Sequence, residues 1–397
     1  MCRVSRSGVI CLILIVSDQR FDCFNILGVY RSANVIPIFS IMNSQLHRHL
    51  ATIAVLLTLP TPAWAQGTFV ASSIAPDSGE QRHLSNIRQL TNGGENAEAY
   101  FSADGKQLIF QSTRDGRTCD QQYTMNTDGT NAQRVSNGKG KTTCGYFTDG
   151  DRRIFYASSS AVDSACTPRP DPSKGYLWRL DPYDIYTANA DGSRLKRLTN
   201  YGIYTAEGIL SPDGKHIVFT SLKDGDLDIY TMNADGTNVK QLTHTIGYDG
   251  GPWWSPDGKQ IVYRAFHPTE PNDLADYRAL LAERLVRPNK MDLWIMNADG
   301  SDQRQITHLG GASFGPSWTP DGRQIVFSSN YHTNPKLGNF DIFLVNPDGT
   351  GLEQITTNST FDGFPMFSPN GKQLVWASNR HVKNPHETNV FIADWRD

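Results

Sequence analysis

The sequence predicts an all-β fold, a β-propeller of six four-stranded blades, and two recurring turns carry this prediction. The first turn occurs six times, at Phe101–Gly105, Phe147–Gly150, Ser211–Gly214, Ser255–Gly258, Thr319–Gly322 and Ser368–Gly371. The second turn occurs between them, at Asn126–Gly129, Asn189–Gly192, Asn233–Gly236, Asn297–Gly300 and Asn346–Gly349. Because Gly after Asp or Asn supplies the positive φ of a tight hairpin turn, each unit contains two hairpins and therefore four strands.

The strands are clearest in the unit between Ala206 and Thr243. Ala206 begins a strand that leads into the first turn, and Ile217–Thr220 follows that turn. After a loop, Ile229–Met232 leads into the second turn, and Val239–Thr243 completes the unit. Aromatic and β-branched residues dominate these segments, as is typical of strands.

The spacing of the units indicates a closed ring. The aspartates of the second turn, at 128, 191, 235, 299 and 348, are 63, 44, 64 and 49 residues apart, so the base period is near 44 with insertions. Four-stranded propeller blades repeat about every 40 to 50 residues. The last unit ends after its third strand, Val390–Ala393, whereas Ile87–Thr91 copies the fourth strands at Arg304–Thr307 and Glu353–Thr356. We therefore expect the N-terminal strand to complete the last blade, which removes a free sheet edge.

The Ser-Pro-Asp-Gly turn at Ser211–Gly214 and the Asn-Ala-Asp-Gly turn at Asn233–Gly236 resemble those of the TolB-like family. Its members are six-bladed propellers with PD40 or WD40-like repeats, and the resemblance covers residues 84–397. TolB proper has a further N-terminal α/β domain that engages the Tol inner-membrane machinery, whereas Gln66–Gln81 precede the propeller here. The resemblance implies a binding protein, because TolB-like propellers bind partner proteins and peptide segments.

The segment before the propeller has the features of an export signal. Arg48 gives a basic start, Leu50–Leu59 is apolar, and Ala63-Trp64-Ala65 resembles a signal-peptidase site. We expect Met42 to be the true initiator and the protein to be periplasmic or secreted. The expected parts are an upstream over-extension (1–41), a signal peptide (42–65), an N-terminal linker (66–83) and the propeller (84–397).

Composition limits the class of partner. A net charge of −3 and a pI near 6.4 argue against nucleic acid, which requires a basic face. The apolar stretch Val9–Val16 is too short to span a bilayer, so we expect no membrane span. We expect a monomer.

Three cysteines follow the export signal, Cys119, Cys144 and Cys166. In a compartment that favours oxidation, we expect one disulfide and one remaining thiol. A zinc site made of all three is the alternative, but the spacings of 25 and 22 residues match no compact ligand motif.

Antiparallel strands place the two tight turns of every blade at one end of the ring and the longer loops at the other. Function is expected at the long-loop face. Its insertions fall between the second and third strands, at Ser159–Pro182, His267–Lys290, Tyr331–Asn339 and Asn379–Thr388. Apolar residues at Leu274, Tyr277, Leu281 and Leu285 have helical spacing, so we expect a short helix that packs on neighbouring loops or grips a partner.

Four acids lie in connections that precede the first strands of their blades and reach the mouth of the central channel. Their positions relative to the following turn indicate that they are equivalent: Glu98, Glu207, Asp249 and Asp362. A ring of carboxylates would favour a cation or a basic peptide end. Tyr248, Trp253 and Phe361 are the candidate aromatic contacts, with a place in the core as the alternative for each of them. The structural alternative is that the acids cap loop backbone. The predicted function is therefore an exported, non-catalytic module that binds an envelope protein or peptide.

A second acidic set is interpreted as structural. Asp184, Asp228, Asp292 and Asp341 each stand at the start of a third strand. Their recurrence in blade after blade predicts a common loop-bracing hydrogen bond, since one catalytic centre needs only one copy.

Three histidines give the alternative function. His267, His332 and His381 occupy similar positions after the second strands of consecutive blades. Some TolB-like propellers are polysaccharide lyases with a His-bound metal, so a metal-dependent lyase or hydrolase is the competing hypothesis. Equivalent points on adjacent blades are about 10 Å apart, whereas metal ligands lie about 2 Å from the ion.

Two further motifs are assigned to the propeller rather than to chemistry. Gly311–Gly315 matches the Gly-x-Ser-x-Gly nucleophile motif, but Pro316–Trp318 continues a propeller strand where the motif requires a helix. Asp224–Asp228 resembles a calcium loop, but Ile229 stands where an EF-hand requires Gly. We expect a hairpin loop there and no cofactor, with calcium or a transition metal as the alternative.

Overall fold

The computed structural model describes residues 2–5, 8–11, 71–333 and 338–396. The chain divides into two compact units, residues 1–68 and 69–397. The described residues of the first unit form an antiparallel hairpin, β1 (Cys2–Ser5) and β2 (Gly8–Cys11). The expected signal peptide and the start of the linker lie outside the described residues. No helix among the described residues is long and apolar enough to cross a membrane.

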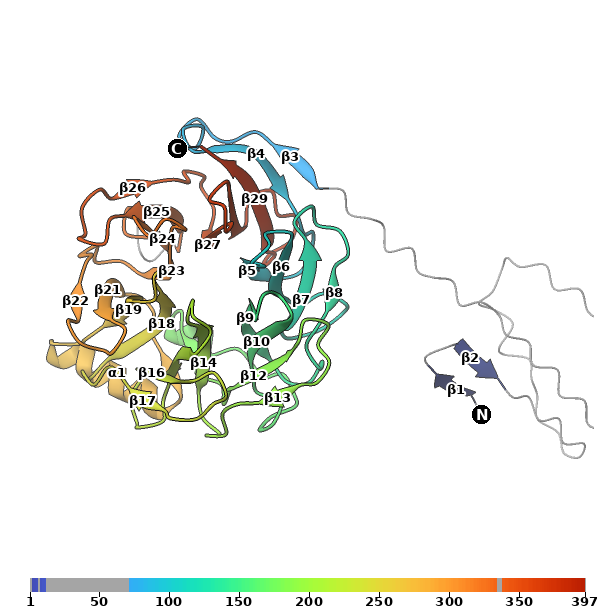
Figure 1. The fold of residues 1–397 in the computed structure, drawn as a ribbon, viewed down its shortest axis with the longest axis horizontal. Helices are drawn as coiled ribbons and strands as arrows, with labels where there is room; N and C mark the ends of the chain where they lie inside the picture. Colours follow the sequence, from blue (N-terminus) through green and yellow to red (C-terminus); the bar gives the residue numbers. More distant parts are fainter. Residues whose placement is uncertain (1, 6–7, 12–70, 334–337, 397) are drawn as a thin grey trace, which may run out of the picture. The chain divides into compact units, whose positions relative to one another are not determined.

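The second unit is a six-bladed β-propeller, as the repeats predict (Figure 1). Blade 1 consists of β5 (Asn96–Phe101), β6 (Gln107–Ser112), β7 (Gln121–Asn126) and β8 (Gln133–Arg134). Blade 2 consists of β9 (Thr142–Thr148), β10 (Arg153–Ser158), β12 (Asp184–Asn189) and β13 (Lys196–Arg197). Blade 3 consists of β14 (Thr205–Leu210), β15 (His216–Ser221), β16 (Asp228–Asn233) and β17 (Lys240–Gln241). Blades 4 and 5 consist of β18 (Tyr248–Trp254), β19 (Gln260–Phe266), β21 (Asp292–Asn297), β22 (Arg304–Gln305); and β23 (Ser313–Trp318), β24 (Ile325–Ser329), β25 (Asp341–Val345), β26 (Glu353–Gln354).

Blade 6 joins the two ends of the propeller, as predicted. It contains β27 (Asp362–Phe367), β28 (Gln373–Ser378) and β29 (Asn389–Trp395), and the N-terminal β4 (Leu84–Gln89) pairs antiparallel with β29. Figure 1 shows the blue β4 beside the red β29. The segment expected to be a linker adds a fifth strand, β3 (Ser72–Ile74), outside β4.

A buried ion cluster fixes the N-terminal segment to blade 6. The Arg380 guanidinium donates to the Glu80 carboxylate at 2.9 Å and to the Asp362 carboxylate at 2.7 Å. Glu80 and Asp362 have no exposed surface. The indole Nε1 of Trp376 donates to the second Asp362 oxygen, and the Trp376 ring lies beneath the guanidinium. Loss of one partner from such a cluster would destabilise the fold, because it would leave a buried charge uncompensated.

The same hydrogen-bond brace occurs in all six blades. In blade 2, Thr199 Oγ1 donates to the Asp184 carboxylate and accepts the Ile185 N–H, each at 2.9 Å. The equivalent pairs are Thr243–Asp228, Thr307–Asp292, Thr356–Asp341, Ser136–Gln121 and Thr91–Asn389. The structural interpretation of the repeated aspartates is therefore confirmed. In blade 6 the brace also joins the N-terminal segment to β29.

Replacement of Arg380 by Met should leave two buried carboxylates without a counter-charge. We expect a loss of about 3 kcal/mol or more in the free energy of unfolding, measured by urea denaturation. The control is Arg82→Ala, because this side chain is 73% exposed in its ion pair with Glu353. That variant should lose less than about 1 kcal/mol. Equal losses would contradict a dominant role of the buried cluster.

Candidate functional site

The inner strand of every blade contains a β-bulge near the long-loop end of the ring. Its residue has a positive φ, and the pairing of the first two strands shifts register around it. The six bulge residues are Glu98, Cys144, Glu207, Gly251, Gly315 and Phe364. Bulges bend a strand and re-aim its side chains. Here they bring corresponding parts of successive inner strands together around the ring axis.

Two bulge carboxylates bind the bulge backbone of the next blade. Glu98 of blade 1 accepts the Cys144 N–H of blade 2 at 3.2 Å, and Glu207 of blade 3 accepts the Gly251 N–H of blade 4 at 2.8 Å. The two glutamates therefore share a structural role. They differ in one respect, because Glu207 also forms a salt bridge with Arg264, whereas no described salt bridge includes Glu98.

Aromatic rings fill the axis two residues beyond the bulges. The Tyr100 and Tyr146 ring centroids are 4.6 Å apart, and both rings contact Trp253 at 5.6 and 5.3 Å. Tyr100 belongs to blade 1 and Trp253 to blade 4, which are opposite in a ring of six. A contact between opposite blades closes the axis at this level, so the bulge residues lie between this aromatic layer and the long-loop face.

Arg264 is the central cation on the long-loop side of this layer. Only 6% of the residue is exposed. Its guanidinium donates to Glu207 and, at 2.7 Å, to the Tyr248 hydroxyl oxygen. It also lies 5.3 Å from the Trp178 ring and 5.5 Å from the Tyr248 ring. Glu207, Tyr248 and Trp178 come from blade 3, blade 4 and the blade 2 insertion, so one guanidinium connects three parts of the fold.

Two insertions cover this side of the ring. The blade 2 insertion contains a short 3₁₀ helix (Pro172–Lys174) and β11 (Trp178–Arg179), and β11 pairs with β20 (Leu285–Val286) of the blade 4 insertion. Trp178 packs on Phe314 of blade 5, with ring centroids 4.8 Å apart. The two insertions therefore form a lid over this side of the ring. The sequence left open whether an insertion packs on neighbouring loops or grips a partner, and the lid contains such packing between loops.

The predicted helix is present as α1 (Pro271–Ala282). Tyr277 and Leu280 are its buried side chains, and Leu285 lies beyond it in β20. The Tyr277 hydroxyl donates to the Asp226 carboxylate and to the Gly247 carbonyl. These contacts dock the helix on the blade 3 to blade 4 junction, as expected for a helix that packs on neighbouring loops.

The four predicted acids do not occupy one equivalent set of positions, so this part of the prediction is wrong. Glu98 and Glu207 are bulge residues, whereas Asp249 and Asp362 precede the bulges of their strands by two residues. Asp249 pairs with His267 at 3.0 Å, and Asp362 pairs with Arg380. Residues two apart in a strand face the same side but lie at different depths, which is why they appear equivalent in sequence.

The aromatic candidates have packing contacts. Tyr248 is buried beside Arg264. Phe361 is half-buried and lies between the rings of Phe340 and Phe364, at centroid distances of 5.8 and 6.2 Å. Trp253 belongs to the aromatic layer described above.

The three histidines are not brought together. His267 pairs with Asp249 and His332 pairs with Asp341, each within its own blade. His381 lies in a loop and itself has a positive φ. Burial lowers the pKa of His332. Within residues 2–5, 8–11, 71–333 and 338–396, no group of three or more His, Cys, Asp or Glu residues is arranged to hold a metal ion.

The two other motifs belong to the propeller. Ser313 is fully buried in the inner strand β23 and donates to Ser329 Oγ, so Gly311–Gly315 is not a nucleophile turn. The aspartates of the calcium-like loop have separate partners: Asp224 accepts from the Tyr230 hydroxyl, Asp226 from the Gly247 N–H, and Asp228 from Thr243.

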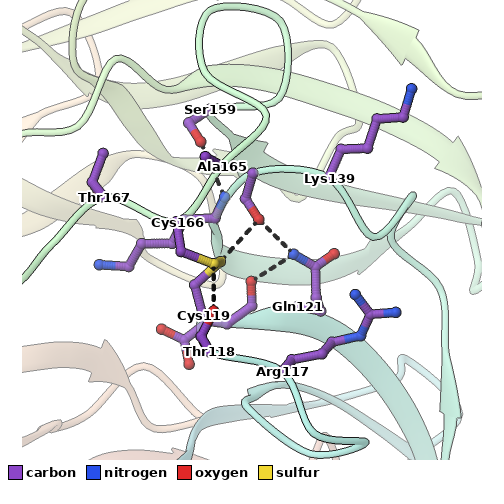
Figure 2. Close-up of a disulfide and its surroundings, with 12 residues drawn as sticks. Arg117, Thr118, Cys119, Gln121, Lys139, Ser159, Ala165, Cys166 and Thr167 are labelled. Atoms are coloured by element: carbon purple, nitrogen blue, oxygen red, sulfur yellow. Dashed lines mark hydrogen bonds between the residues drawn. A yellow bond between two sulfur atoms is a disulfide. The ribbon is translucent and has the colours of Figure 1, made fainter.

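Two of the three cysteines form the expected single disulfide. Cys119 and Cys166 are joined with Cα atoms 5.6 Å apart, and Cys144 is free and buried. Figure 2 shows the disulfide beside Thr118, Gln121 and Ala165. Thr118 Oγ1 donates to Cys166 Sγ at 3.1 Å. The bridge connects the loop between β6 and β7 with the blade 2 insertion.

Comparisons with known proteins agree with this architecture. A family model described as the TolB beta propeller domain, PD40, matches residues 170–270. The Tol-Pal system protein TolB of Nitratidesulfovibrio vulgaris is 52% identical over 40 residues, which cover 10% of this chain and 9% of that protein. The matched segment thus spans less than a tenth of that relative.

Solved structures resemble the propeller as a whole. A putative TolB from Agrobacterium tumefaciens has a TM-score of 0.51 at 18% identity and covers 77% of this chain and 91% of its own. A gluconolactonase from Xanthomonas campestris has a TM-score of 0.55 at 13% identity and covers 84% of this chain and 99% of its own. At these identities the likeness shows the fold alone.

The protein is therefore a six-bladed β-propeller of four-stranded blades, and two insertions cover the mouth of its ring. Within this fold, residues 170–270 match the model of the TolB beta propeller domain.

The Glu98 carboxyl gives a pH-dependent stability. Part of the side chain is accessible, but the inner strands enclose the carboxyl, and this burial, together with Glu207, raises its pKa to about 7. The folded protein therefore holds the proton at a higher pH than the unfolded chain does. The resulting stabilisation is complete below about pH 4.5 and is lost as the pH rises to about 7.

Glu98→Gln should not show this loss. Relative to the unmodified protein, its free energy of unfolding should rise by about 2 kcal/mol between pH 5 and pH 8. This value is smaller than the whole pKa shift would give, because part of the side chain is accessible to water. Urea denaturation at several pH values measures the difference. Glu270→Gln, at an exposed position before α1, is the control and should show no change. Parallel pH profiles for Glu98→Gln and the unmodified protein would contradict the prediction.

Proposed function

We propose that this protein is an exported TolB-like propeller that binds a protein or peptide of the cell envelope at its long-loop face and performs no chemistry. The observation that carries the proposal is the lid, because two insertions pair across this face and present an aromatic side chain. Tyr176 in the blade 2 insertion is 70% exposed. Tyr is one of the residues that most often anchors protein interfaces, since its ring is large, rigid and amphipathic.

Further exposed apolar side chains support this choice of face. Val162 lies in the same insertion as Tyr176, and Ile246 lies in the connection from blade 3 to blade 4. Both connections are on the long-loop face. Leu195 and Leu352 are also exposed, but they follow tight turns on the opposite face and provide matched controls.

The Glu98 carboxylate is the proposed polar determinant beneath the lid. Glu207 and Asp362 pair with arginines and Asp249 pairs with His267, which leaves Glu98 as the predicted acid outside every described pair of this kind. A basic side chain or peptide amino group would supply the missing positive charge and would lower the cost of ionising this enclosed carboxyl.

Export is proposed from the signal sequence and from the disulfide. The Ala63–Ala65 cleavage motif predicts removal of the leader. Disulfides persist in oxidising compartments such as the periplasm, and Cys119–Cys166 is consistent with this location.

Affinity capture from an envelope extract tests the proposal. We expect the unmodified protein to retain a partner that the double variant Tyr176→Ala, Glu98→Gln loses by at least tenfold, measured by quantitative mass spectrometry and then by titration with the purified partner. Leu352→Ala removes an exposed apolar side chain from the opposite face and should leave retention unchanged. Identical retention by all three proteins would reject the long-loop face as the binding site.

Metal removal tests the competing enzyme hypothesis. The binding proposal predicts that elemental analysis finds less than one Zn, Mn or Ca per protein and that a chelator leaves the melting temperature unchanged. A stoichiometric metal whose removal lowers the melting temperature would instead favour the metal-dependent lyase or hydrolase.

A further inference from the structure

One part of the lid lacks packing of its own. Residues 160–176, which we call the axial strap, include no buried side chain, although Ser159 before them and Leu177 after them are buried. Leu177 packs with Leu280 and Leu285, and the next residues form the β11–β20 pair. The strap is therefore a surface segment that ends in a firmly packed base.

Besides hydrogen bonds such as those from the Gly140 N–H to the Ser164 carbonyl and from Thr167 Oγ1 to Asp181, a disulfide and two ion pairs hold the strap. Its Cys166 is bonded to Cys119 of blade 1. Its Arg169 pairs with Glu95, and its Lys174 pairs with Glu283 at 2.8 Å. Both ion pairs join exposed or partly exposed side chains, and such pairs contribute little because water and salt screen them. The disulfide is therefore the strongest attachment of the strap (Figure 2).

These attachments define the course of the strap. Glu95 directly precedes the inner strand β5 of blade 1, whereas Glu283 directly follows α1 in the insertion of blade 4. Blades 1 and 4 are opposite in the ring. The strap consequently runs across the long-loop side of the ring, which is the side of the aromatic layer on which the bulge residues Glu98 and Cys144 lie.

We propose that the Cys119–Cys166 disulfide is a redox latch that keeps the axial strap closed over the ring axis. A dithiol reductant would deliver two electrons and two protons, converting the disulfide into two thiols while the reductant becomes a disulfide. The strap then retains the two ion pairs and its hydrogen bonds to neighbouring loops, none of them covalent, and moves about its base near Gly175, which has a φ of 85°. This regulation concerns the site at the ring axis and so rests on the proposed function.

Cys144 provides a reporter, because it is a bulge residue on the side of the ring that the strap crosses and only 8% of it is exposed. The full chain is treated with iodoacetamide, and peptide mapping measures the modification of Cys144 separately from the other cysteines. We expect Cys144 to react at least tenfold faster after reduction with dithiothreitol, and also in Cys119→Ser/Cys166→Ser, than in the oxidised protein. Burial raises the pKa of the Cys144 thiol, so reaction in the closed state should be slow.

Hydrogen–deuterium exchange separates strap opening from general unfolding. Residues 160–176 should lose protection in the reduced protein, whereas residues 177–183 and the blades should keep theirs. Ile325→Val, a conservative change in the core of blade 5, is the control for a modest loss of stability and should leave the Cys144 rate unchanged.

Unchanged Cys144 reactivity and unchanged strap exchange after reduction would overturn the latch, as would loss of protection throughout the blades. Neither measurement requires the binding partner. Failure of the latch would therefore leave the proposed function standing, and failure to capture a partner would leave the latch standing.

Discussion

Closure of the ring by β29 and β4 is the constraint on which the rest of the structure depends. Each inner strand contacts the next blade, so the bulges can surround one axis only if blade 6 is completed and held against blade 1. The chain secures this closure twice, through the Thr91–Asn389 brace and through the Glu80–Arg380 pair. Both contacts join residues from opposite ends of the propeller, and both are buried. A closed ring also leaves no long strand edge available for pairing with another chain.

The architecture was predictable from the sequence because its determinants are local and repeated. A Gly in the Ser211–Gly214 turn has a φ of 73°, and the Asp228–Thr243 brace recurs with the same spacing in several blades. Non-repeating features were not predictable. Nothing in the pattern of Ser72–Ile74 distinguishes a fifth strand from a linker, and the partner of Glu80 lies 300 residues away. The pairing of β11 with β20 likewise depends on two insertions that share no motif.

The candidate site was predicted only in part, because sequence spacing does not reveal depth or partners. The distance to the Asp or Asn of the following turn could have separated the four acids. This distance is six residues for Glu98 and Glu207, and eight residues for Asp249 and Asp362. Arg264 and Arg380 carried no comparable signal. Each lies near the end of a second strand, binds a carboxylate from elsewhere in the chain and stacks on aromatic rings. Buried pairs of this kind contribute little net stability, but loss of one member leaves an uncompensated charge.

The different partners of these acids limit which of them could take part in the proposed binding at the ring mouth. Glu207 and Asp362 are committed to guanidinium groups, and a ligand that displaced them would leave a buried arginine without its partner. Glu98 accepts the neighbouring bulge N–H and belongs to no salt bridge among the described residues, so a cationic group could approach its carboxyl without disrupting one. That carboxyl lies beneath the lid, however, and the lid side chain Trp178 packs across to blade 5. Under the proposed function, a partner could therefore bind the exposed lid surface while the axis is closed, whereas contact with Glu98 would require movement of the lid.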